Sequence, residues 1–98
     1  MKQEEAKRIL SDVNPEHHFW VNNGPVLKNL EELYKALSKM KKEAYVHHVN
    51  NDKNDFSNWV RDIIGDKKLA EDLLKTKSKK DTVAIVRQRL QYLKKSAA

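Results

Sequence analysis

The segment 55–65 constrains the fold most, because it places an apolar stripe at helical spacing between two turn signals. The stripe is made of Phe56, Trp59, Val60, Ile63 and Ile64. Steps of three and four residues put such side chains on one face of an α-helix. Asp55 is the expected N-cap of this helix, and Gly65 stands where a left-handed residue would end it. The sequence therefore predicts a helix that buries this face in a core.

Helical periodicity also covers most of the remaining chain. Asn29, followed three residues later by Glu32, predicts a capped helix with the buried stripe Leu30, Leu33, Tyr34, Leu37 and Met40. Asp66 can cap a further helix that buries Leu69, Ala70, Leu73 and Leu74. Short helices are also expected within residues 3–13 and 43–49. A last helix, starting at Ser78 or Asp81, would bury Val83, Val86, Leu90 and Leu93.

One short stretch lacks this periodicity. Asn23-Gly24 lies between two short extended pieces, and this dipeptide favours a tight hairpin turn because both residues tolerate positive φ. Pro25 has no amide donor, so the hairpin would be small and at an edge. We therefore expect an all-α fold of five or six short helices with one small β-hairpin near Asn23-Gly24, forming a single compact domain over residues 1–98.

Composition removes several classes of protein. The chain has no cysteine, so disulfides and thiolate metal sites are absent. The longest stretch without a charged residue, 17–27, is far too short to cross a bilayer. The first residues lack the basic start and apolar run of a secretory signal. We expect a cytoplasmic protein with no membrane association.

The positive charge is concentrated in the segment 75–98. This segment has eight basic residues and the single acid Asp81, a net charge of +7, whereas residues 1–74 have twelve bases and thirteen acids, a net charge of −1. The eight bases are Lys75, Lys77, Lys79, Lys80, Arg87, Arg89, Lys94 and Lys95. A basic surface of this kind attracts polyanions such as nucleic acid, or an acidic protein surface. The alternative is a solvated lysine-rich helix whose charge serves only solubility.

Histidines and acids offer weaker candidates for chemistry. The pairs His17-His18 and His47-His48 could suggest a metal site, but adjacent side chains diverge and each pair offers one ligand at most. His48 with the acids Asp52, Asp55, Asp62 and Asp66 could be posed as an acid–base cluster for a metal-dependent or hydrolytic reaction. The acids have simpler roles in caps, turns and solvated faces, so we expect no catalysis, no metal and no cofactor.

The aromatic residues are mostly expected in the core. Phe56 and Trp59 lie on the apolar stripe, whereas Trp20, beside Asn22 and Asn23, is the one of these aromatics for which partial exposure is an alternative. Exposed aromatic rings can stack on unpaired bases. Trp20 could also form a small pocket with His48 and Asn50, suited to a ligand or a peptide end. The simpler reading is a ring that plugs one end of the core.

The spacing of several residues resembles a small uncharacterised domain family of archaea and bacteria. The resemblance rests on Phe19-Trp20-Val21, Gly24, Leu27, Leu30, Glu32, Leu33, His48-Val49-Asn50, Asn54-Asp55-Phe56, Trp59, Asp62, Gly65-Asp66 and Leu69-Ala70. It covers about residues 18–74 and leaves the basic part, 75–98, outside. It implies a prokaryotic, mostly helical domain and transfers no catalytic role.

These observations favour a non-catalytic binding module that associates with a polyanion, most plausibly nucleic acid, through its basic last helix. The competing class is a protein-interaction or self-association domain. If the last helix did not fold onto the body, its apolar residues, Ile85 and Tyr92 among them, would require a partner or a second copy in a homodimer.

Overall fold

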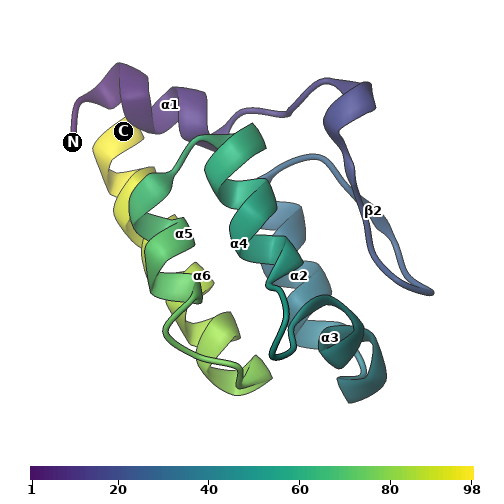
Figure 1. The fold of residues 1–98 in the computed structure, drawn as a ribbon. Coiled ribbons are helices and arrows are strands. Elements are labelled where there is room, and N and C mark those ends of the chain that lie inside the picture. The colour runs from purple at the N-terminus through teal and green to yellow at the C-terminus, as the bar shows by residue number, and fades with distance from the viewer.

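Helix α6 (Lys79–Ala97) is the element against which most of the body packs. In the computed structural model, which describes residues 1–98, it lies against α1 (Gln3–Leu10), α2 (Leu30–Lys39) and α5 (Lys67–Leu73) (Figure 1). Its side chains Val86, Leu90 and Leu93 are buried as expected, Val83 is partly buried, and Thr82 is buried as well. Because α6 folds onto the body, its apolar face is not available to a partner helix.

The segment 55–65 forms the helix that its stripe predicts. It begins as α4 (Asp55–Trp59) and continues as a π-helical turn, η2 (Val60–Ile64), that ends at Gly65. Four of the five stripe residues are buried and Ile63 is partly buried. Gly65 has φ 84°, the left-handed conformation expected of a residue at this position.

The N-cap of α4 differs from the prediction. The side chain of Asn54, not that of Asp55, accepts a hydrogen bond from the Ser57 amide at 3.0 Å. Asn54 is buried and also donates to the Leu73 carbonyl at 3.3 Å, while the carboxylate of Asp55 is engaged by other side chains. Both residues are good N-caps, and tertiary contacts decide which of them takes the position.

The remaining elements are short. They are η1 (Pro15–His17), the strands β1 (Phe19–Trp20) and β2 (Val26–Leu27), and α3 (Lys42–His48). The strands pair antiparallel, Phe19 opposite Leu27 and Trp20 opposite Val26, so the expected hairpin around Asn23-Gly24 is confirmed. The N-caps Asn29, Asp66 and Ser78 are confirmed by their side-chain hydrogen bonds. The fold is thus an all-α globule of six α-helices with one small hairpin, as the sequence predicts.

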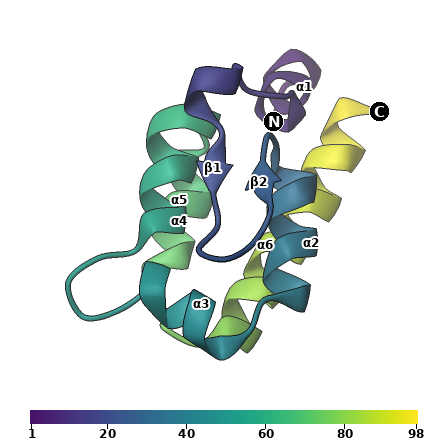
Figure 2. The ribbon, with the colours of Figure 1, turned by 90° about the vertical axis from the view of Figure 1, so that its right-hand side faces the viewer.

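The hairpin lies along one side of the helical body, next to α2 (Figure 2). Its inward residues Phe19 and Leu27 are buried, whereas their strand neighbours Trp20 and Val26 are exposed. The core, which includes Phe56, lies between the hairpin and the helices. No helix is both long and apolar enough to traverse a bilayer.

Candidate functional site

The start of α6 meets the junction between α2 and α3 at one end of the bundle. The Lys79 ammonium donates to the Leu37 carbonyl at 3.3 Å, and the hydroxyls of Tyr45 and Thr82 are hydrogen-bonded at 2.7 Å. Burial raises the pKa of Tyr45 above its ordinary value, although the bond to Thr82 opposes this, so the phenol is neutral at physiological pH. These contacts join two segments that lie about forty residues apart in the sequence.

The joined segments, 39–43 and 77–81, form a basic surface that we call the lysine end. It holds six lysines and two acids, Glu43 and Asp81, for a net charge of +4. The lysines are Lys39, Lys41, Lys42, Lys77, Lys79 and Lys80. None of them lies within 4.0 Å of a carboxylate oxygen, and all but the partly buried Lys79 are exposed. Lys77 and Lys79 each donate to a neutral protein oxygen, and the other four ammonium groups are available to an anionic ligand.

Three of the eight cations expected to bind a polyanion are instead paired with acids. Arg89 binds Asp66 through two hydrogen bonds, Nε to Oδ2 at 2.7 Å and Nη2 to Oδ1 at 2.9 Å, and the two side chains are only 16% and 1% exposed. This geometry makes Arg89 a structural residue that fastens α6 to the start of α5.

The other two pairs are at the surface. Lys94 pairs with Glu31 of α2, and Lys75 pairs with Asp72 at 3.2 Å. Lys68 holds the same carboxylate, and its hydrogen bond, followed by that of Lys75, lowers the pKa of Asp72.

The other five expected cations have no acidic partner. Lys77 donates to the side-chain oxygen of Asn51 at 2.6 Å, and Lys79 donates to Leu37 as described. Lys80, Arg87 and Lys95 are exposed and make no ion pair. The basic surface is thus centred on the start of α6, and it extends onto Lys39, Lys41 and Lys42, which the sequence analysis left out. Their charge run is visible in the sequence, but its proximity to α6 is not.

A groove of about 610 Å³ borders the lysine end. It lies between the hairpin and the α2–α3 region, and among its lining residues Val21, Leu27, Ala36 and Met40 are buried and form an apolar floor. Its rim includes the exposed lysines Lys35, Lys39 and Lys41, together with Glu32 and Glu43. Lys39 and Lys41 also belong to the lysine end, so the two features are one continuous surface.

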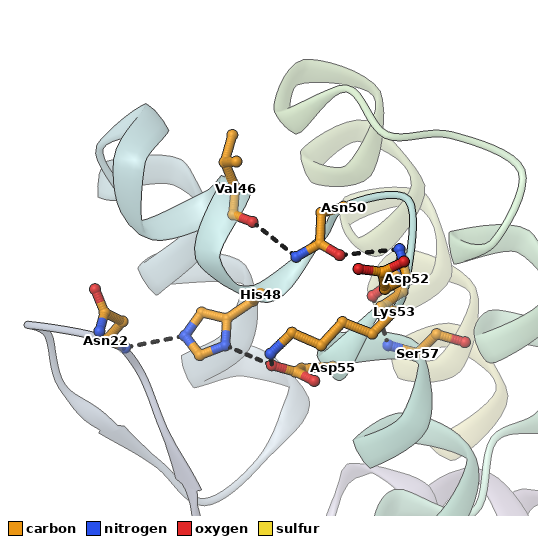
Figure 3. Close-up of polar contacts among 9 residues, drawn as sticks. Asn22, Val46, His48, Asn50, Asp52, Lys53, Asp55 and Ser57 are labelled. Atoms are coloured by element: carbon orange, nitrogen blue, oxygen red, sulfur yellow. Dashed lines mark hydrogen bonds and ion pairs between the residues drawn. The ribbon is translucent and has the colours of Figure 1, made fainter.

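His48 is a structural residue rather than a surface histidine. It is 5% exposed, and its ring packs against Phe19 and Phe56 at centroid distances of 5.0 and 5.2 Å. Its Nε2 accepts from the Asn22 amide at 2.9 Å, so the proton of the neutral ring is on Nδ1, which lies 2.9 Å from Asp55 Oδ2 (Figure 3). The imidazole thereby ties the hairpin to the end of α3 and the start of α4.

Asp55 completes this network. Burial opposes ionisation of its carboxyl, but hydrogen bonds from Lys53 at 2.8 Å and from His48 outweigh it and lower the pKa of Asp55. Of the four acids considered with His48, only Asp55 contacts it: Asp62 pairs with Arg61 and Asp66 with Arg89. No three histidine, aspartate or glutamate side chains converge where they could hold a metal ion.

Trp20, His48 and Asn50, the residues of the expected pocket, have different surroundings in the structure. Both ring nitrogens of His48 are occupied, and Trp20 is 73% exposed on the outer face of the hairpin. The Asn50 amide donates to the Val46 carbonyl at 3.3 Å, and its oxygen accepts from the Asp52 amide at 3.0 Å (Figure 3). Asn50 therefore shapes its own loop.

A family model described as a family of unknown function, DUF5752, matches residues 16–93. The chain belongs to this family. The match confirms the expected uncharacterised domain family, and it extends past residues 18–74 to include the lysine end and α6 as far as Leu93. No curated protein and no solved structure matches the chain significantly.

Several of the residues that carried the resemblance have structural roles in this DUF5752 domain. His48 and Asn54 make the contacts described above, and the indole of Trp59 donates to the His17 carbonyl at 2.8 Å. The motif therefore accounts for how the hairpin and its preceding loop are attached to the helices.

Proposed function

We propose that this protein is a non-catalytic module that binds a polyanion, the phosphate backbone of a nucleic acid, through the lysine end. The observation that carries the proposal is the gathering of six lysines without acidic partners at one end of the bundle, in segments with a net charge of +4. Lysine contacts to phosphates release counterions and give affinity without reading sequence. A cytoplasmic location, expected from the sequence, is part of the proposal.

The positions of the unpaired cations on α6 favour the start of the helix as the binding surface over its C-terminal end. Arg89 and Lys94 are held by acids of α5 and α2 regions, so the end of α6 nearer the C-terminus offers fewer available charges than its start. Lys80 and Arg87 are seven residues apart and both exposed, which extends the basic surface along one flank of α6. A nucleic-acid backbone would meet the lysine end first and follow this flank.

Charge reversal at the lysine end tests the proposal. The triple variant Lys41→Glu, Lys42→Glu and Lys80→Glu should abolish most binding to labelled mixed-sequence oligonucleotides, measured by fluorescence anisotropy. For the native protein, three or four phosphate contacts predict that affinity falls by roughly 40- to 150-fold for duplex DNA and by roughly 20- to 50-fold for a single strand between about 50 and 200 mM salt.

The matched control reverses three lysines elsewhere. Lys2, Lys7 and Lys67 are exposed and outside every ion pair. They also lie near one another in space, because Arg8 of α1 donates to the Ile64 carbonyl and so holds α1 beside the start of α5. Changing these lysines to Glu alters the net charge by the same amount and should leave most of the binding intact. Equal loss in the two triple variants, or binding that does not respond to salt, would reject the lysine end as the site. If polyglutamate bound as tightly as the oligonucleotides, the proposed ligand would be an acidic protein surface and not nucleic acid.

A further inference from the structure

Trp20 is the most exposed large apolar side chain of the fold. It is 73% exposed, and its indole makes no hydrogen bond. Strand alternation explains its direction: Phe19 stacks on Phe56 in the core at 5.1 Å, so the next residue, Trp20, faces outward opposite Val26. The indole thus offers a large flat face to solvent, which makes Trp20 a candidate contact residue.

Two hydrogen bonds fix the backbone directly after Trp20. The Val21 amide donates to the Pro25 carbonyl at 3.1 Å, and the next amide, Asn22, donates to the buried His48 ring at 2.9 Å. These bonds hold the strand before a ligand arrives, so little backbone entropy is lost when a flat ring stacks on the indole.

Trp20 does not itself line the groove, but its cross-strand neighbour does. Val26, the cross-strand neighbour of Trp20, lines one side of the groove, and Lys35, Lys39 and Lys41 line the other. Figure 2 shows the hairpin and α2 side by side on the same face of the molecule. A chain that runs from the exposed indole past Val26 therefore reaches the groove and, across its apolar floor, the lysines on the far side.

We infer that the ligand of this surface is single-stranded nucleic acid, with one unpaired base stacked on Trp20 and the adjoining phosphates on the lysines of the groove and the lysine end. The inference rests on the proposed function and specifies its substrate. Bases in a duplex are stacked and paired, so only a single strand can offer a base face to a side chain. The positive rim lysines complement the charge of the phosphates.

Three variants separate stacking from charge. Trp20→Ala should weaken binding of a short oligothymidylate about 5- to 140-fold, the range expected for the loss of one base–aromatic contact, and leave its salt dependence unchanged. Trp20→Phe should keep most of the affinity. Tyr92→Ala is the matched control, because Tyr92 is also an exposed aromatic but lies on α6 against Arg89, away from the groove.

Fluorescence gives a second readout. Trp59 is 7% exposed, so quenching of tryptophan emission by oligothymidylate should come from Trp20 and disappear in Trp20→Phe. If Trp20→Ala binds oligothymidylate as tightly as the native protein while the lysine reversals abolish binding, the inference fails and the proposed function stands. Equal affinity for duplex and single strand also overturns the inference. If the native protein shows no salt-dependent binding to any nucleic acid, both the inference and the proposed function are rejected. A dimer by light scattering that Trp20→Ala converts to a monomer would assign the indole to a second copy of this chain and overturn the inference.

Discussion

The Asp66–Arg89 pair provides the sharpest test of the fold. Asp66 accepts from the Leu69 amide at 3.2 Å as the N-cap of α5, and it also accepts from Nε and Nη2 of Arg89. Replacing an aspartate cap by alanine costs about 1 kcal/mol, and leaving the partner of a buried ion pair alone costs about 3–5 kcal/mol. Because Arg89 is 16% exposed, water can reach part of it and the lower end applies. Asp66→Ala should therefore destabilise the protein by about 4 kcal/mol.

Urea unfolding followed by circular dichroism measures this loss. Asp66→Asn retains a capping oxygen but not the charge, so its loss should be smaller than that of Asp66→Ala. Arg87→Ala is the matched control on the same helix, because Arg87 is exposed and makes no ion pair, and its effect should stay within about 0.5 kcal/mol. A loss below about 1 kcal/mol for Asp66→Ala, or equal losses for Arg87→Ala and Arg89→Ala, would refute the structural role of the pair.

Three further predictions concern the hairpin anchor and the end of η2. His48→Phe should destabilise the protein by about 2–4 kcal/mol, since it removes both ring hydrogen bonds, and should speed hydrogen exchange of the Asn22 amide. The pKa of Asp55 lies below its ordinary value of 3.8, so its carboxylate stabilises the fold above that pH and the contribution is lost as the pH falls through the folded pKa. Asp55→Asn should consequently flatten the acid limb of the stability–pH profile measured by denaturant unfolding. Gly65→Ala should cost about 1–2 kcal/mol in thermal melts, because φ is 84° and an added Cβ would lie 2.9 Å from Nη1 of Arg8.

Local patterns predicted the helices well because each depends on residues a few positions apart. The stripe from Phe56 to Ile64, the left-handed Gly65 and the hairpin turn at Asn23-Gly24 all formed as expected. The predicted N-cap of α4 was wrong by one residue. Two adjacent residues suited that cap, and the contacts of Asn54 with Leu73 lie outside the range of any local rule.

The candidate site was predicted less well. The sequence indicated an excess of cations after Lys75, but it favoured a Trp20 ring that plugs one end of the core, whereas the structure leaves that ring 73% exposed. It could not indicate that His48 is buried, since a histidine beside polar turn residues is usually at the surface. Nor could it show that Lys39, Lys41 and Lys42 lie beside the start of α6.

The sequence by itself therefore determined the helices, the hairpin, every predicted cap except that of α4, and the net charge, because short-range hydrogen bonding and apolar periodicity set these features. Only the tertiary structure decided which charges remain available. Asp66 and Arg89 are 23 residues apart, and Lys79 and Leu37 are 42 apart, so packing of α6 against α5 and α2 brings them together. Coulomb attraction and desolvation depend on distance and burial in space, and a linear chain specifies neither until it has folded.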